Sequence, residues 1–381
     1  MSIYLWIVLI ISFYFLFLTI INILYITSNT YSILKNNTEH VTVCIPARNE
    51  EKNIEKCIRS LMNQSYENYD VIVLNDNSSD LTENIIKKLV AEFPSKLRMI
   101  KGRPLPLFWT GKVYAMNQLV QEAKGEYLLF TDADTIHNHN SIGFALTNLK
   151  KNNADMLSGF IKEDMKSFGE QITVPLMYIL ISFVIPLFLN KITSFIFPSV
   201  AVGQYIMIKK NVLKNIGGYE SLKNEISEDI VLARLVKQAG YKTIFVDCKQ
   251  AAKCRMYESY QESVNGIIKN IFSFMNNKTF ILFSAMMIVV LFLVLPFPLF
   301  LFSFANDVLT GYEWSYFTIF CGMNVFIMFL VWLILALYQN LPMTVPFLYP
   351  ILFLNLTYMA ILSYNRSISG SGFIWKDRIL R

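Results

Sequence analysis

Long apolar stretches without charge alternate with one polar region along the chain. The charge-free stretches are residues 1–34, 279–306 and 314–365. A helix needs about 20 apolar residues to cross a bilayer. The last stretch is long enough for two helices, and Gln339–Pro342 is the natural turn between them. The pattern therefore predicts four membrane spans, at residues 3–27, 279–304, 315–338 and 343–364.

The first apolar stretch is predicted to be an uncleaved anchor that occupies residues 1–34. It has no basic segment at its start. Its apolar run is also longer than the core of about 7–15 residues that is typical of a cleaved signal peptide.

The polar region, residues 35–278, alternates between strand-like and helix-like segments. Helical patterns at 51–63, 81–92 and 112–124 separate apolar runs at 41–45, 70–74, 97–101 and 127–130. Continuous rather than alternating apolar strands are typical of a parallel sheet that helices cover on both faces. We therefore predict an α/β, Rossmann-like domain with a mainly parallel sheet.

The charge distribution supports this division into membrane and water-soluble parts. The chain is 54% hydrophobic and only 16% charged, whereas globular chains average about 25% charged residues. Thirty of the 34 lysines and arginines and 25 of the 28 acidic residues fall in residues 35–278, which therefore carry a net charge of +5. This mild excess suits a surface beside anionic lipid. It is too diffuse to indicate a nucleic-acid partner.

The positive-inside rule places this basic domain in the cytoplasm of a multi-pass plasma-membrane protein. Four spans would then put the basic tail, residues 366–381, outside, which the same rule disfavours. Either one span of the group 279–365 is re-entrant, or residues 172–189 form a fifth crossing. Pro175 and Pro186 interrupt that segment, so we interpret residues 171–202 as interfacial helices.

Three polar clusters follow the predicted strands, at Pro46–Glu51, Asn75–Asp80 and Asp132–Asp134. Ligands of parallel sheets bind beyond the carboxyl ends of the strands. Asp132 and Asp134 place two carboxylates on one short turn, and a divalent cation would relieve their repulsion. Carboxylate and phosphate oxygens are the usual environment of Mg²⁺, and we extend this expectation to Mn²⁺. The alternative is a solvated turn.

The other polar residues each have a structural alternative. Asp76 is placed to bind a ribose hydroxyl or a base, whereas Asp80 is assigned to capping the next helix. Arg48 and Glu50 are expected at a nucleotide. Lys112 begins a helix and suits a phosphate, or is a surface lysine.

Two further groups have weaker patterns. Glu228 and Asp229 open an amphipathic helix after Ser227, the expected N-cap, and Asp229 is either a general base or a favourable first-turn charge. His137 and His139 are possible metal ligands or solvated loop residues. The five cysteines lack zinc-site spacing and are interpreted as buried thiols.

Together these motifs resemble family 2 of the inverting nucleotide-sugar glycosyltransferases, which have the GT-A fold. The matching landmarks are Ile45–Glu51, Asn75–Asp80, Asp132–Asp134, Gly217–Tyr219 and Glu228–Asp229. The resemblance implies a UDP-sugar donor, Mg²⁺ or Mn²⁺ on Asp132 and Asp134, and Asp229 as the catalytic base. The donor-binding residues that it implies are Pro46, Ala47, Arg48, Glu50, Asp76, Lys112 and Asp132.

Finer landmarks are similar to the branch that contains diaponeurosporenoate and hopene-associated glycosyltransferases. They are Trp109–Lys112, Arg255–Tyr257, Gly266–Lys269 and Trp375–Arg378. The branch implies a bacterial enzyme that moves a sugar, with glucose favoured, to a membrane lipid such as a carotenoid acid or another isoprenoid or glycolipid. Glu228, Arg255 and Tyr257 are placed on the acceptor side, although an ion pair and a packing tyrosine explain the last two equally well.

Departures from the branch leave the acceptor open. Ile267 stands where a tryptophan is usual, and Asp377 stands where a glycine is usual. The chain lacks the Q/R-x-x-R-W motif of processive synthases. A processive polysaccharide synthase and a polyprenyl-phosphate glycosyltransferase remain as alternatives, and a non-enzymatic scaffold is the third.

Overall fold

The structure is a computed structural model that describes residues 3–32, 37–179, 183–191, 195–275, 278–311, 313–369, 373–375 and 378–380. The chain forms two compact units. Unit 1 comprises Met1–Ile23, Met165–Pro186 and Tyr257–Arg381, and unit 2 comprises Leu24–Asp164 and Leu187–Met256. The predicted strands all fall in unit 2.

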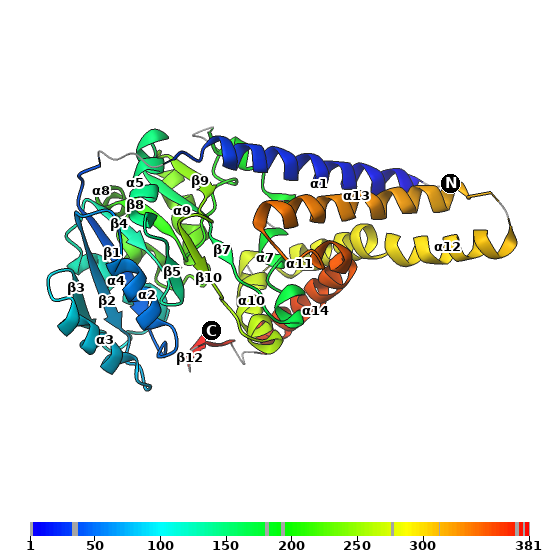
Figure 1. Ribbon diagram of the computed structural model, residues 1–381. Coiled ribbons are helices and arrows are strands. Elements are labelled where there is room, and N and C mark those ends of the chain that lie inside the picture. Colours follow the sequence, from blue (N-terminus) through cyan, green and yellow to red (C-terminus); the bar gives the residue numbers. More distant parts are fainter. Residues whose placement is uncertain are drawn as a thin grey trace. The chain divides into compact units, whose positions relative to one another are not determined.

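Unit 2 is built on a seven-stranded sheet with the order β3-β2-β1-β4-β8-β6-β9 (Figure 1). Its strands are β1 (Val41–Ala47), β2 (Tyr69–Asn75), β3 (Leu97–Lys101), β4 (Tyr127–Phe130), β6 (Met156–Phe160), β8 (Ile206–Lys209) and β9 (Thr243–Asp247). Neighbours pair in parallel except at β8, which is antiparallel to both β4 and β6. The prediction of a mainly parallel sheet is confirmed.

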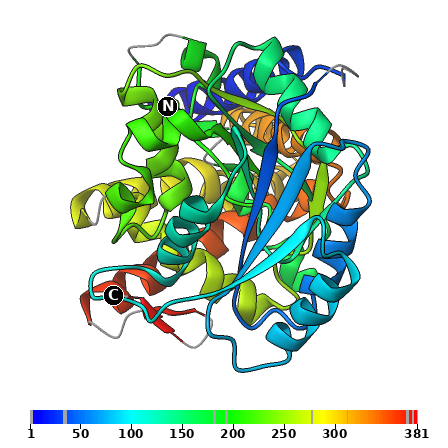
Figure 2. The same ribbon diagram turned by 90° about the vertical axis from the view of Figure 1, so that its left-hand side faces the viewer.

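Helices cover both faces of this sheet, which explains why the strands are apolar throughout (Figures 1 and 2). One core receives residues from α2 (Ile54–Met62), α3 (Thr82–Glu92) and α5 (Ser141–Lys151). The other receives residues from α4 (Gly111–Glu122), α8 (Lys210–Asn215) and α9 (Glu228–Gln238). Val43 and Ile45 face the first core and Cys44 faces the second, as the two-residue period of a strand requires.

Strand β1 runs to Ala47, two residues beyond its predicted end before Pro46. Proline is normally excluded from a central strand because it lacks a backbone N–H. Here β4 pairs with β1 only as far as Cys44, and the backbone of Pro46 points to that same side. The missing donor therefore faces a position where β4 has already ended.

A second, three-stranded sheet has the order β5-β10-β7. It consists of β5 (Thr135–His137), β10 (Ala252–Cys254) and β7 (Lys162–Glu163). Cys254 pairs with Thr135 on one side and with Glu163 on the other. This small sheet therefore brings the residue after Asp134 and the side chain of Glu163 to either side of one cysteine.

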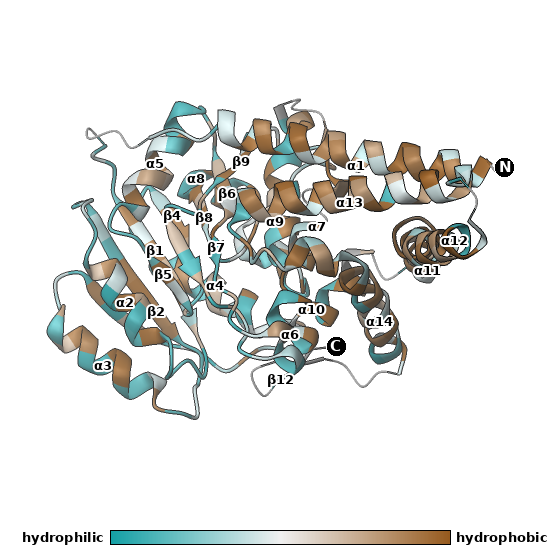
Figure 3. Ribbon diagram, turned by 45° about the vertical axis from the view of Figure 1, so that its right-hand side comes forward, coloured by the Kyte–Doolittle hydropathy of each residue, from teal (hydrophilic) through white to brown (hydrophobic). Residues whose placement is uncertain are grey.

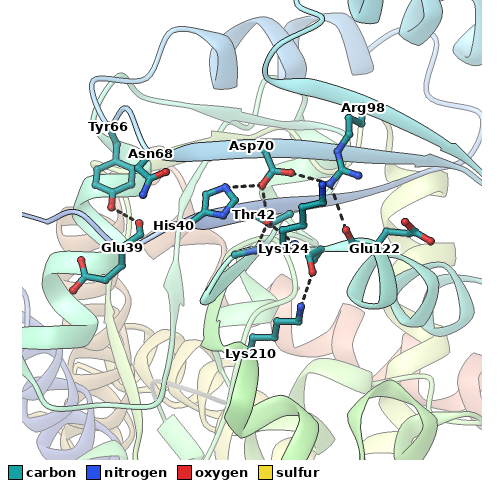
Figure 4. Close-up of polar contacts among 12 residues, drawn as sticks. Glu39, His40, Thr42, Tyr66, Asn68, Asp70, Arg98, Glu122, Lys124 and Lys210 are labelled. Atoms are coloured by element: carbon teal, nitrogen blue, oxygen red, sulfur yellow. Dashed lines mark hydrogen bonds and ion pairs between the residues drawn. The ribbon is translucent and has the colours of Figure 1, made fainter.

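Polar contacts close the amino ends of β1, β2 and β3 (Figure 4). The carboxylate of Asp70 accepts a hydrogen bond from Thr42 Oγ1 at 2.6 Å, and it lies 3.0 Å from Arg98 NH2 and 3.1 Å from His40 Nε2. Lys210 Nζ donates to the carbonyl of Ala123, at the end of α4, at 2.6 Å. This end of the sheet thus pairs its charge with opposite charges or helix carbonyls.

Unit 1 contains helices that are long and apolar enough to cross a membrane (Figure 3). Four such helices occur in the described residues, at Ile3–Ser28, Thr279–Thr310, Tyr316–Gln339 and Val345–Ile368. The first of them begins in unit 1, and its last residues belong to unit 2. They correspond to α1 (Ile3–Ser28), α11 (Thr279–Val289) to α12 (Pro296–Thr310), α13 (Tyr316–Gln339), and η5 (Val345–Leu348) with α14 (Tyr349–Ile368). They match the four spans predicted from hydropathy.

Helices α1 and α13 lie side by side (Figure 1). Asn324 Nδ2 donates to Ser12 Oγ between them, and the rings of Trp6 and Phe320 meet edge to face. Ser12 Oγ also donates to the Val8 carbonyl of its own helix at 2.8 Å, so the bond from Asn324 adds an interhelical contact to a serine that is already satisfied as a donor.

The segment proposed as a fifth crossing forms short helices where it is described. These are α7 (Leu176–Ile179) and η2 (Leu187–Lys191), of four and five residues, and α6 (Phe168–Gln171) precedes the segment. Helix α10 (Tyr260–Phe274) follows unit 2, and Thr173 Oγ1 donates to Ser263 Oγ of α10 at 2.8 Å. Their interfacial placement stays a prediction.

Candidate active site

The predicted site residues gather at the carboxyl ends of the parallel strands of unit 2. Pro46 and Ala47 end β1, and Asp76 follows β2. Asp132 and Asp134 follow β4. Lys112 lies in the first turn of α4, which precedes β4 in the chain. Because all these strand ends share one edge, the topology places the three polar clusters together.

Lys112 connects two acidic pairs that are far apart in the sequence. Its Nζ lies 2.9 Å from Asp132 Oδ1 and 3.2 Å from Glu228 Oε1. Burial acts to lower the pKa of Lys112, but the charges of Asp132, Glu228 and Asp229 prevail and raise it well above its ordinary value. Lys112 is therefore a cation held between carboxylates, with a third of its side chain exposed, and its role at a phosphate stays a prediction.

Asp134 is a buried carboxyl among like charges. Burial, together with the charges of Asp132 and Glu50, raises its pKa from 3.8 to about 7. Its Oδ1 atom is buried and has no hydrogen-bond partner among the described residues. The Cys254 thiol bonds to the same carboxyl and acts in the opposite direction.

These observations fit a divalent cation. The orphaned oxygen of Asp134 and the excess negative charge around it are what a hard cation would satisfy, since Mg²⁺ and similar ions prefer carboxylate oxygens. Asp132 and Asp134 are the residues that would hold it. No group of three or more potential protein ligands occurs in the described part of the chain, so further ligands would come from phosphate or water.

Asp229 lies in the first turn of α9 with both carboxylate oxygens bonded to backbone N–H groups. Gly203 N donates to Oδ2 at 2.9 Å and Ile230 N donates to Oδ1 at 2.8 Å. Burial and the charge of Glu228 raise the pKa of Asp229 from 3.8 to about 6, against Lys112 and these two donors. A carboxylate with a pKa near neutrality is suited to general-base work.

The loop after β1 is tied to the loop after β2. Arg48 NH1 donates to the carbonyls of Asp76 and Asn77 at 2.7 and 3.0 Å. Asp80 accepts from the Thr82 backbone N–H at 3.0 Å, which confirms its predicted capping role at the start of α3. Arg48 thus shapes the loop that carries Asp76, and the side chain of Asp76 is mostly buried.

Neither histidine after Asp134 faces the two aspartates as a ligand. His137 is buried and hydrogen-bonds to Thr131 and Ser141 at 3.0 and 2.9 Å, and burial lowers its pKa to about 3. His139 Nδ1 lies 2.6 Å from the Asn63 carbonyl. All five cysteines are buried free thiols, as predicted.

The three residues predicted for the acceptor side, Glu228, Arg255 and Tyr257, have different surroundings. Glu228 lies at Lys112 in unit 2. Arg255 belongs to unit 2 and Tyr257 to unit 1. The Tyr257 ring lies so close to Gly266 of α10 that an added Cβ there would be 2.4 Å from it. This contact supports the packing explanation for Tyr257, and its role at an acceptor stays a prediction.

Sequence reasoning missed three residues beside the site. Gly203 donates its amide to Asp229, and the neighbouring Gln204 binds Glu163, which is buried. Glu163 belongs to a two-residue strand without a hydrophobic pattern, so no periodicity marks it. The available clue was the lone glycine before a strand, a common sign of close backbone approach.

Comparisons with known proteins agree with this architecture. Residues 42–217 match the family model described as "Glycosyl transferase family 2". The chain is similar to a beta-monoglucosyldiacylglycerol synthase of Trichormus variabilis, with 34% identity over 103 residues, which is 26% of this chain and 21% of the relative. It is also similar to a 4,4'-diaponeurosporenoate glycosyltransferase of Staphylococcus haemolyticus, with 35% identity over 97 residues, 26% of this chain and 24% of the relative.

Among solved structures, the chain is similar to the mannosyltransferase PcManGT from Pyrobaculum calidifontis in complex with GDP-Man and Mn²⁺. The TM-score is 0.54 at 15% identity, and the match covers 95% of this chain and 99% of that one. The fold of unit 2 is therefore the GT-A type, as the motif resemblance implied.

The similarity to glycosyl transferase family 2 covers the part of the chain from β1 to Gly217. The matched segments span less than a quarter of these two curated relatives. The relatives therefore define the class of the catalytic domain, and the substrates of this chain are a matter for proposal.

Proposed function

We propose that this protein is an inverting glycosyltransferase that moves a sugar, glucose in the first instance, from a UDP-sugar to a membrane lipid. The main observation that supports this proposal is that Lys112 bridges Asp132 and Glu228 beside Asp229. This arrangement joins a candidate diphosphate site to a candidate base.

The donor would lie across the carboxyl edge of the sheet. Uracil and ribose would contact Pro46, Ala47, Arg48, Glu50 and Asp76. Asp132 and Asp134 would hold Mg²⁺ or Mn²⁺, which when bound would neutralise the diphosphate leaving group. The mannosyltransferase of similar fold, in complex with GDP-Man and Mn²⁺, supports a nucleotide-sugar and metal pairing.

Asp229 would perform the proton transfer. The acceptor hydroxyl gives its proton to Asp229 while its oxygen attacks the anomeric carbon from the face opposite the diphosphate. The new glycosidic C–O bond forms as the bond from the anomeric carbon to the phosphate oxygen breaks, and UDP leaves with that electron pair. A single displacement of this kind inverts the configuration. An acceptor carboxylate would need no deprotonation.

A lipid acceptor is favoured because the same chain carries four apolar helices long enough to cross a membrane. The similar proteins named for glucosyl-diacylglycerol and diaponeurosporenoate chemistry support a glycolipid or a carotenoid acid. Glu228, Arg255 and Tyr257 are proposed for the acceptor side. The proposed location is the bacterial plasma membrane, with unit 2 in the cytoplasm.

The test is to incubate purified protein with radiolabelled UDP-glucose and bacterial lipid extract, with and without EDTA. We expect label in the organic phase only when divalent metal is present, and the label should resist mild acid. Acid-labile label would instead identify a polyprenyl phosphate acceptor, and label in water-soluble polymer would identify a processive synthase. No transfer from any UDP-sugar would contradict the proposal.

A further inference from the structure

We propose that Val202–Tyr205 forms a strap that positions Asp229, anchored by the hydrogen bond between Gln204 and Glu163. This inference rests on the proposed function in taking Asp229 as the base. Gln204 and Glu163 act through the strap, so they are positioning residues rather than groups that touch substrate.

Each of four consecutive residues in the strap is held by a different element. Val202 N donates to Ser158 Oγ of β6 at 2.8 Å, and Gly203 N donates to Asp229 Oδ2 of α9 at 2.9 Å. Gln204 Nε2 donates to Glu163 Oε1 of β7 at 2.7 Å. Tyr205 OH donates to the Ser141 carbonyl of α5 at 2.6 Å. So many separate attachments in one short segment leave the Gly203 amide little freedom.

The amide of Gly203 matters because it is one of two donors to the Asp229 carboxylate. The ionisable groups facing that carboxylate are Glu228 on its own helix, Lys112 on α4 and Tyr219 in η3 (Gly218–Leu222). A hydrogen bond to the charged form of an acid favours that form. If the amide moves away, Asp229 should bind its proton at higher pH and its orientation should loosen.

Position 203 leaves little room for a side chain. A Cβ there would lie 3.2 Å from Lys112 Nζ and 3.5 Å from Asp229 Oδ2. A methyl group would push the lysine away from the site and take the place of solvent around both charges. The backbone angle at Gly203 is an ordinary one, so alanine would act through these neighbours and not through strain.

The anchor residue is buried and joined to one side chain. Glu163 is 6% exposed, and its second oxygen, Oε2, has no partner among the described residues. Burial, with a smaller contribution from the charge of Asp134, raises the pKa of Glu163 to about 8, which favours the protonated form near neutral pH. Glutamine has nearly the same shape and can also accept from Gln204, so Glu163→Gln should preserve the anchor.

The experiment measures the pH dependence of kcat for the full chain in detergent, with lipid extract and UDP-glucose as substrates. The variants are Gln204→Ala, Gly203→Ala, Glu163→Gln and Asp229→Asn. We expect Gln204→Ala and Gly203→Ala to lower kcat about tenfold and to move the acid limb up by about one pH unit, from the loss of one charge-assisted interaction. Gln204→Ala should leave KM for UDP-glucose within about twofold, and Glu163→Gln should match the wild type.

A control with similar burial separates positioning from general damage. Gln118 of α4 is 5% exposed and its side chain bonds to backbone away from the strap. Gln118→Ala should lower stability without moving the acid limb. If Gln204→Ala does not fold, Gln204→Met, which keeps a side chain of similar length and cannot donate to Glu163, carries the same test.

The outcomes separate the strap from the function on which it rests. An unmoved acid limb in the folded strap variants, with Asp229→Asn inactive, would overturn the strap and leave the proposed base in place. An active Asp229→Asn would overturn both. A Glu163→Gln protein as impaired as Gln204→Ala would show that the anchor is not the hydrogen bond proposed here.

Discussion

The two ends of the central sheet treat their carboxylates in opposite ways. At the amino end, Asp70 lies within 3.1 Å of Thr42, Arg98 and His40 (Figure 4). At the carboxyl end, Asp132 and Glu228 share the single cation of Lys112, while Asp134 and Asp229 have raised pKa values. Asp70 is thus paired with cations, whereas Lys112 only partly offsets the repulsion among the acids at the carboxyl end.

We infer from this difference that the charges at the amino end stabilise the fold, whereas those at the carboxyl end are arranged for the proposed reaction. An acid placed among opposite charges stabilises the native state, whereas acids placed among like charges destabilise it. We expect such an arrangement where a ligand supplies the missing positive charge, and the proposed cation, bound with the diphosphate, would do so here. Substituting equivalent charged residues at the two ends, one at a time, tests this inference.

The largest difference between the two ends is expected in kcat, when one carboxylate is removed from each end in separate variants. Asp229→Asn should lower kcat by about 10²–10⁴-fold, because the acceptor would lose its general base. Asp70→Asn should change kcat by less than about threefold if its network only stabilises the fold. Steady-state kinetics of sugar transfer would measure both, and equal losses would erase the distinction between the two ends.

A pair of lysines gives the next test. Lys112→Met removes the shared cation, so Asp132, Glu228 and Asp229 would repel one another without compensation. We expect at least a tenfold lower kcat/KM for the UDP-sugar and an acid limb at higher pH, because Lys112 acts to lower the pKa of Asp229.

The matched control is Lys210→Met at the amino end. The Lys210 ammonium donates to the Ala123 carbonyl at the end of α4, so its loss should cost about 0.3–1 kcal/mol of stability and leave kcat/KM unchanged. A Lys112→Met enzyme with normal kinetics would contradict the bridge.

The smallest effect should be seen in stability, and its sign should differ between the ends. The folded pKa of Asp229 is raised from 3.8 to about 6. Between these values the folded state holds a proton that the unfolded state releases, so stability should fall as pH rises through this window. Above it, Asp229→Asn should stabilise the ligand-free protein by about 1–2 kcal/mol after discounting for solvent screening.

Asp70→Asn should instead destabilise the protein by about 1–2 kcal/mol, because it weakens the contacts with Arg98 and His40. Thermal melting of both variants at pH 5 and pH 7.5 would show the contrast. If the melting temperature falls in both variants at pH 7.5, the charged Asp229 stabilises the folded protein, which would contradict this prediction.

The sequence predicted the fold well where periodicity carried the information. Uninterrupted apolar runs at β1, β2 and β4 indicated a sheet covered on both faces, and charge-free stretches located the four apolar helices. The end of β1 was misjudged because the rule against proline assumes partners on both sides, and β4 ends before Pro46.

The sequence indicated which polar residues lie at the strand ends, but it did not indicate the contacts that they make in three dimensions. Asp132 and Asp229 carry recognisable motifs, but nothing in the sequence shows that Lys112 reaches both acidic pairs. Glu163 and Gln204 were missed because their hydrogen bond joins residues 41 positions apart. Register is normally set by the hydrophobic pattern of a strand, but the two-residue strand that carries Glu163 is too short to have one.

The most direct test of the account is calorimetric titration of UDP into the purified full chain, with and without Mg²⁺. We expect the wild-type chain to release heat of UDP binding only when Mg²⁺ is present. The Asp134→Asn variant should not bind UDP, and the Asp70→Asn variant should bind it normally. UDP binding that is equally strong without metal, or that persists in Asp134→Asn, would contradict the claim that the charge-frustrated end of the sheet is a metal and nucleotide-sugar site.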